Sequence, residues 1–120
     1  MNMPNLPEGF PSPAYQRDGE DYISIRDLHE WLEINQEFIQ YWRAIKNSLH
    51  LKEGVDYEET KDEDHYNRLN AYAPMYTVWM IVYCCKNRKQ KVDTCAYLLD
   101  CAAQLKELLS AKKSANHHMT

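Results

Sequence analysis

Apolar residues recur three and four positions apart in two neighbouring stretches of the chain, a spacing that predicts two consecutive amphipathic helices. The first helix is expected from about Ile25 to Glu33, with its apolar stripe at Ile25, Leu28, Trp31 and Leu32. The second is expected from about Gln36 to Leu49 and buries Phe38, Ile39, Trp42, Ile45 and Leu49. Ser24 and Asn35 precede the two segments and are residue types that cap helix N-termini. Two capped helices separated by a short polar break predict a helix-turn-helix pair.

Two more helices are expected in the C-terminal half of the chain. Pro74 precedes a nearly continuous apolar run from Met75 to Cys85, which predicts a helix buried on several sides. A last, long helix is expected from about Lys89 to Ala111, and its apolar stripe is broader than the preceding helix can cover. Because leftover apolar surface usually marks an interface, we expect a homo-oligomer. The expected oligomerisation residues are Val92, Leu99, Leu105 and Leu109, unless the N-terminal arm or the first two helices cover this stripe.

Strand signals are fewer. Val55 to Glu58 and Ala71 to Met75 are expected to form a small two-stranded ribbon with the hydrophilic run from Glu59 to Asn70 as its tip, and Tyr22 to Ile25 could add a short strand. Residues 1–20, with four of the five prolines, are expected to be an extended arm, residues 21–111 a single domain and residues 112–120 a flexible tail. The predicted fold class is α+β and mainly α-helical, with a helix-turn-helix pair, a two-stranded ribbon and a long C-terminal helix.

Negative charge is concentrated in one segment. The chain carries a net charge of -4, whereas residues 52–64 hold seven acidic residues against two lysines, so the remaining residues are close to neutral. Affinity for duplex DNA comes largely from cations that neutralise phosphates. A neutral body with one acidic segment is therefore weak evidence for DNA binding and better evidence for a protein partner with a basic surface.

Catalytic and metal-binding motifs are missing from the sequence. With three glycines there is no phosphate-binding loop, no Gly-x-Ser-x-Gly turn occurs, and the four cysteines have no Cys-x-x-Cys spacing. The acidic segment lacks the residue order of a calcium loop, and His29 is more simply a structural residue than a ligand or a base. We expect no enzyme, no cofactor and no metal. With neither a signal-peptide pattern nor a membrane-length apolar run, the protein is expected in the cytosol.

Two sets of residues are candidates for partner contacts. The polar side of the second helix and the acidic segment together give a protein-binding set: Gln36, Gln40, Arg43, Lys46, Glu58, Glu59, Asp62 and Glu63. If the chain binds DNA instead, the cations for phosphate contacts are Arg43, Lys46, Lys86, Arg88, Lys89 and Lys91, with Gln36, Gln40 and Asn47 as readers of base edges.

Three short motifs resemble those of phage antirepressors of the AntA/AntB family. These are Arg26-x-Leu28-His29-x-x-Leu32, Glu53-Gly54-x-Asp56-Tyr57 and, more loosely, Tyr76-Thr77-Val78-Trp79-Met80, within a resemblance that runs from about Tyr22 to Leu99. The resemblance implies a phage or prophage protein of the bacterial cytosol that counters a helix-turn-helix repressor and so induces lytic genes. The acidic insertion from Lys61 to Asn70 and the Cys84-Cys85 pair depart from the family pattern. The alternatives are a sequence-specific DNA-binding regulator and a small inhibitor of a host defence or replication protein.

Overall fold

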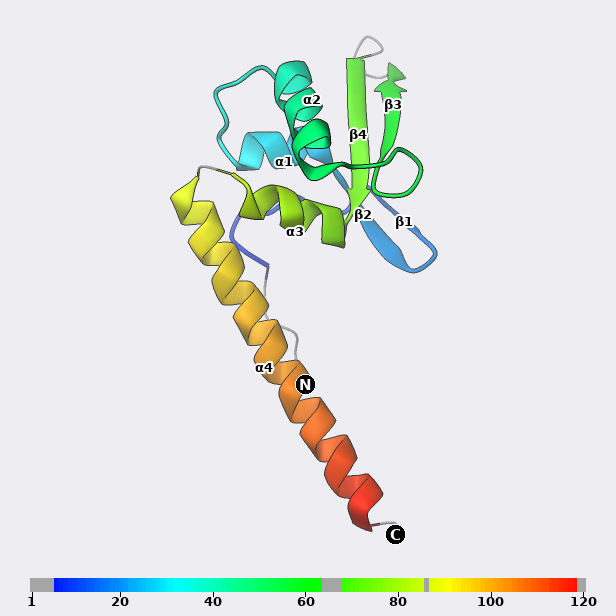
Figure 1. The fold of residues 1–120 in the computed structure, drawn as a ribbon, viewed down its shortest axis with the longest axis vertical. Coiled ribbons are helices and arrows are strands. Elements are labelled where there is room, and N and C mark those ends of the chain that lie inside the picture. The colour runs from blue at the N-terminus through cyan, green and yellow to red at the C-terminus, as the bar shows by residue number, and fades with distance from the viewer. Residues whose placement is uncertain (1–5, 64–67, 86, 119–120) are drawn as a thin grey trace.

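The computed structural model describes residues 6–63, 68–85 and 87–118, except for the side chains of residues 88 and 112–118 (Figure 1). Along the chain, two strands are followed by two helices, then by two more strands and two more helices. The strands are β1 (Tyr15–Arg17), β2 (Glu20–Ser24), β3 (Glu58–Asp62) and β4 (Arg68–Pro74). The helices are α1 (Ile25–Trp31), α2 (Phe38–Leu49), α3 (Met75–Tyr83) and α4 (Arg88–His118).

The predicted fold class is wrong, because the protein is built on a curled, antiparallel sheet of four strands and not on a helix-turn-helix pair with a two-stranded ribbon. The strand order is β1-β2-β4-β3, so β4 lies between β2 and β3 although it is the last strand in the sequence. Tyr22 pairs with Tyr15 in β1 and with Pro74 in β4, which makes β2 an inner strand. Strands account for about 22% of the chain, so the sheet is a major layer of the domain.

The expected ribbon tip is also wrong, since much of the run from Glu59 to Asn70 belongs to the strands. Glu59 pairs with Ala71 and Asp62 with Arg68, which extends the β3–β4 pairing well beyond the expected start of the loop. These hydrophilic residues fit a strand because alternate side chains point to opposite faces of a sheet. The side chains on the face of the sheet opposite the helices, which we call the curled face, include Glu58 and Asp62. Their carboxylates accept hydrogen bonds from the hydroxyl groups of Tyr15 and Tyr72.

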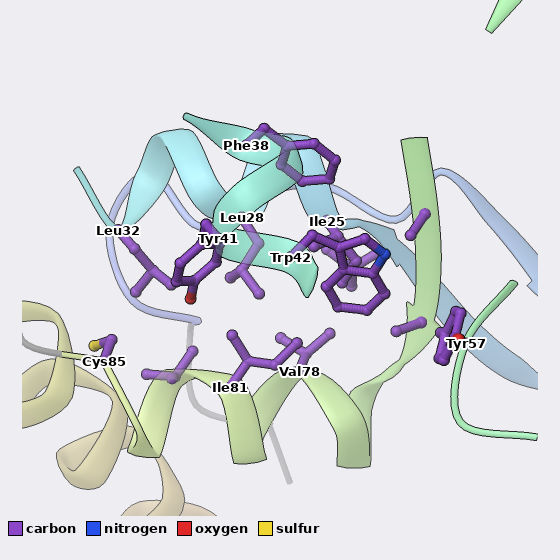
Figure 2. Packing of buried hydrophobic residues seen from close by; sticks show 14 residues of the cluster. Ile25, Leu28, Leu32, Phe38, Tyr41, Trp42, Tyr57, Val78, Ile81 and Cys85 are labelled. Carbon is purple, nitrogen blue, oxygen red and sulfur yellow. The ribbon is translucent and has the colours of Figure 1, made fainter. Parts of the chain in front are cut away.

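One face of the sheet supports the hydrophobic core (Figure 2). Ile23 from β2 and Ala71 and Ala73 from β4 are nearly inaccessible to solvent and pack with residues from α1, α2 and α3. The helical contribution includes Ile25, Leu28, Leu32, Phe38, Tyr41, Trp42, Val78 and Ile81. The apolar positions of the three helices are thus buried against the sheet. In this layered arrangement the helices and the sheet cover each other's apolar faces.

Local sequence explains how the first two helices begin. Ser24 caps α1 as predicted, since its Oγ accepts a hydrogen bond from the Asp27 N–H at 3.3 Å. The N-cap of α2 is Glu37 and not Asn35, because the Glu37 carboxylate accepts from the Ile39 N–H at 3.4 Å. The turn between these helices includes Glu33, whose φ of 55° is left-handed. A non-glycine residue in this region is uncommon and marks a sharp change of chain direction.

The last helix is anchored at its beginning and projects at its end (Figure 1). Asn87 Nδ2 donates to the Leu32 carbonyl, and Gln90 Nε2 donates to the Trp31 carbonyl, both at 2.9 Å. The Tyr97 ring lies 5.7 Å from the Trp79 ring of α3, whereas the following turns extend away from the sheet. Among the described residues, no helix combines the length and the apolar character needed to cross a membrane.

Candidate functional site

The exposed side of α2 carries most of the candidate residues that the sequence predicts on this helix. Phe38, Tyr41 and Trp42 are buried, and Gln40, Arg43 and Asn47 are exposed on the other side. Gln36 is exposed in the loop that leads into the helix. The amphipathic pattern therefore places a polar helix face at the surface, with its side chains three and four residues apart.

An ion pair joins α2 to the sheet at the edge of this face. Lys46 Nζ lies 3.0 Å from Glu59 Oε1, and the two side chains are only 25% and 17% exposed. The same ammonium lies 5.6 Å from the centre of the Trp42 ring and 5.7 Å from that of Tyr57. Two predicted partner-contact residues, Lys46 and Glu59, thus contact each other and neutralise each other's charge.

We expect a double-mutant cycle with Lys46→Met and Glu59→Gln to give a coupling free energy of about 1 kcal/mol, above the value of a fully exposed pair, because both side chains are partly desolvated. The measurement is urea unfolding of the four proteins at pH 7. A coupling of zero would show that the two charges do not stabilise the α2–β3 contact.

The curled face of the sheet holds Glu58, another predicted contact residue. Tyr15 donates its hydroxyl to Glu58 Oε2 at 2.8 Å, and Arg17 forms an ion pair with the same carboxylate. The Tyr15 ring lies 5.1 Å from the Tyr22 ring and 5.4 Å from the Tyr72 ring, measured between centres. Burial raises the pKa of Tyr15 above its ordinary value, although nearby Arg17 opposes this rise. Glu58 thus connects the two edge strands, β1 and β3, across the curl.

Asp62 belongs to a partly buried hydrogen-bond network. Its carboxylate accepts from the Tyr72 hydroxyl at 2.9 Å and from Asn70 Nδ2 at 3.1 Å. Asn70 Nδ2 also donates to Ser24 Oγ at 3.0 Å, and Asn70 Oδ1 accepts from the Arg26 N–H at 3.2 Å. Burial, followed by the hydrogen bond to Asp62, raises the pKa of Tyr72. Asp62 therefore connects β3 with β4 and the start of α1, whereas Glu63 beyond it is exposed.

Three exposed glutamates, which the predicted contact set does not include, lie in the last turn of α1, in the following turn and at the N-cap of α2. Glu30, Glu33 and Glu37 are exposed there and take part in neither ion pair of the described residues. Glu33 and Gln36 line a hollow of about 620 Å³ that reaches Tyr41 of α2 and Cys84 beyond α3. A signal was present in the sequence, since three glutamates fall within eight residues across the predicted turn.

The proposed phosphate contacts lie on different helices. Arg43 is exposed on α2, Lys46 is paired with Glu59, and Lys89 and Lys91 lie in the first turn of α4. Lys91 is partly buried, with its ammonium 6.0 Å from the centre of the Tyr83 ring. Lys86 and the Arg88 side chain lie outside the described residues. Of the six cations, Arg43 and Lys89 are thus the ones that the structure describes as exposed.

The contacts of the histidine and cysteine side chains considered above as possible catalytic or metal-binding groups are explained by structural roles. His29 Nε2 lies 2.8 Å from the Gln36 carbonyl, and the imidazole packs against the rings of Phe38 and Tyr41. Burial raises the pKa of the Cys85 thiol, which keeps it protonated and weakly nucleophilic. Within residues 6–63, 68–85 and 87–118, no cluster of three His, Cys, Asp or Glu side chains has the geometry to hold a metal ion.

Comparisons with protein-family models, with curated proteins and with solved structures found no match to this chain.

Proposed function

We propose that this protein is a phage or prophage antirepressor, which binds a helix-turn-helix repressor and prevents that repressor from holding its operator DNA. The proposal rests on the motif resemblance and on one structural observation, the exposed polar face of α2 preceded in the chain by three exposed glutamates, in α1, in the following turn and at the α2 N-cap. The contact surface consists of Gln36, Gln40 and Arg43 together with Glu30, Glu33 and Glu37. We call it the α2 surface.

Electrostatics favour a basic protein partner over DNA at the α2 surface. Its three carboxylates outnumber the single guanidinium of Arg43. The Arg26 guanidinium lies 4.2 Å from the centre of the Phe38 ring at the start of α2, so two cations stand against three carboxylates there. The excess negative charge disfavours the phosphate contacts that supply much of the affinity for DNA. The DNA-reading surface of a repressor has the opposite charge, and complementary charges accelerate association and select the partner.

Internal pairing changes which acidic residues take part in the proposed contact. Glu58, Glu59 and Asp62 already bond to Arg17, Lys46 and Asn70. Breaking these interactions in order to bind a partner would cost the free energy that they contribute to the fold. Glu30 and Glu33 have no such interaction among the described residues, and Glu37 has only the N-cap hydrogen bond from the Ile39 N–H, which makes these glutamates better contact residues than the acidic strand β3.

A matched pair of charge reversals tests this surface. We expect Glu30→Lys with Glu33→Lys to weaken binding of the repressor encoded in the same prophage by about tenfold or more, because two attractive contacts become repulsive. Titration calorimetry at 150 mM salt measures the dissociation constant.

The control combines Glu20→Lys on the β1–β2 hairpin with Glu107→Lys on α4, two exposed glutamates outside the α2 surface. It changes the net charge by the same amount and should leave the dissociation constant within about twofold. Equal weakening by both pairs would show that net charge, and not the α2 surface, governs binding.

A further inference from the structure

The distal part of α4 presents an apolar stripe that no other element covers among the described residues (Figure 1). Leu99, Leu105, Leu108 and Leu109 are between 51% and 70% exposed. Cys95, Leu98, Ala102, Leu105 and Leu109 are separated by three, four, three and four residues, the spacing of a coiled-coil seam. Because most helical stability in proteins comes from tertiary packing of an apolar face, a partner that packs on this stripe would stabilise the projecting part of α4.

A groove complementary to this stripe lies at the other end of the same helix. It has a volume of about 260 Å³ between α3 and α4, and its walls are mainly apolar. Trp79 and Tyr83 form the α3 side, and Lys91, Cys95 and Leu98 contribute from α4. Tyr83 is 78% exposed, which is unusual for an aromatic side chain at the mouth of an apolar groove.

We propose that a second copy of this chain occupies the groove, in a two-fold dimer whose α4 helices run antiparallel. The distal stripe of each copy, from Ala102 to Leu109, packs into the α3–α4 groove of the other. A closed two-fold interface requires that one chain carry both complementary surfaces, here the distal stripe and the α3–α4 groove. In such a dimer the stripe of each copy covers the groove of the other.

The side-chain sequence of α4 fits this antiparallel alignment. With the two-fold axis beside Asp100, Leu98 of one copy faces Ala102 of the other, so that a large side chain meets a small one. Cys95, which lines the groove of one copy, then faces Leu105 of the other copy, and the Leu105 side chain fills the groove. The apolar fit of this stripe to a groove of the same chain, and not a charge pair, favours a second copy as the partner. This proposal does not depend on repressor binding.

Size-exclusion chromatography with light scattering tests the association. The expected mass is twice the 14.3 kDa of the chain. Leu105→Glu should raise the dimer dissociation constant at least about a hundredfold, because it replaces a buried apolar group by a charge in both halves of the interface. Ala103→Glu adds the same charge at an exposed position off the seam and should leave the dimer intact. A monomeric wild-type protein at 200 μM, or a dimer insensitive to Leu105→Glu, would overturn the proposal.

Disulfide trapping tests the orientation, in a background that keeps buried Cys85 and replaces Cys84, Cys95 and Cys101 by serine. One chain has Cys95 restored, and the other carries Leu105→Cys. Oxidation of the mixture should give a cross-linked heterodimer. Each chain alone should remain uncross-linked, because two copies of Cys95 would lie about 15 Å apart along the helices. Cross-linked homodimers of each chain would instead establish a parallel pair and overturn the antiparallel arrangement.

Discussion

Replacing Trp42 by alanine should lower the free energy of unfolding by about 3–5 kcal/mol, a large share of the stability of a domain of this size. The Trp42 side chain is 1% exposed and lies where α2 meets the sheet, with the Tyr57 ring 5.1 Å away in an edge-on contact (Figure 2). Its loss leaves a cavity that the rigid sheet cannot fill. Urea unfolding followed by far-ultraviolet circular dichroism gives the change.

Trp42→Phe is the matched comparison. The indole Nε1 of Trp42 is buried and has no hydrogen-bond partner in the described part of the chain. Phenylalanine keeps an aromatic ring at this position and removes that unpaired donor, whose burial is unfavourable. We expect Trp42→Phe to cost less than half of the loss caused by Trp42→Ala. Equal losses would contradict this expectation and show that a phenyl ring cannot replace the indole in filling this site.

Replacing Asn70 by aspartate should destabilise the protein by about 3–5 kcal/mol at pH 7, because it buries an uncompensated charge. Asn70 is 4% exposed, and its Nδ2 donates to both Ser24 and Asp62. The substitution removes these donors and places a second carboxylate beside that of Asp62. Asn47→Asp makes the same chemical change at an exposed position on α2 and should alter stability by less than about 0.5 kcal/mol.

The loss caused by Asn70→Asp should depend on pH. Burial and the Asp62 carboxylate raise the pKa of the introduced carboxyl in the folded protein above its unfolded value of about 3.9. The folded state therefore binds this proton more tightly than the unfolded state, and the penalty is fully present above the folded pKa. As the pH falls from 7 towards 4, the difference from wild type should shrink. A difference that is constant with pH would mean that the loss comes from missing hydrogen bonds alone.

The sheet was underpredicted because its strands are short and do not alternate cleanly between polar and apolar residues. The dipeptide Asp18-Gly19 follows Tyr15–Arg17 directly, in a segment that the sequence analysis assigned to an extended arm. Both residues have positive φ, 53° and 80°, as in the primed turns that match the twist of a hairpin. This dipeptide is a strong hairpin signal, and it would have placed Tyr15–Arg17 in a strand. The position of β4 between β2 and β3 depends on long-range pairing, which local patterns do not encode.

The candidate site was predicted in part. Helical periodicity correctly placed Gln40 and Arg43 on the exposed side of α2, because burial of Phe38, Tyr41 and Trp42 fixes the orientation of that helix. In β3, the high density of acidic residues in the sequence did not reveal that most of their carboxylates are bonded within the fold. Several of its acidic side chains have partners from segments about 10 to 40 residues away, such as Arg17, Lys46 and Tyr72, and no local pattern shows which charges are neutralised after folding.

The most direct measurement is a mobility-shift titration that contains the repressor of the same prophage, its labelled operator DNA and increasing amounts of this protein. Antirepression predicts that the repressor–operator band gives way to free operator, and that this protein alone shifts no DNA. The Glu30→Lys, Glu33→Lys variant should require a correspondingly higher concentration. A repressor–operator complex that persists at saturating protein, or a shift of operator by this protein alone, would contradict the proposed function.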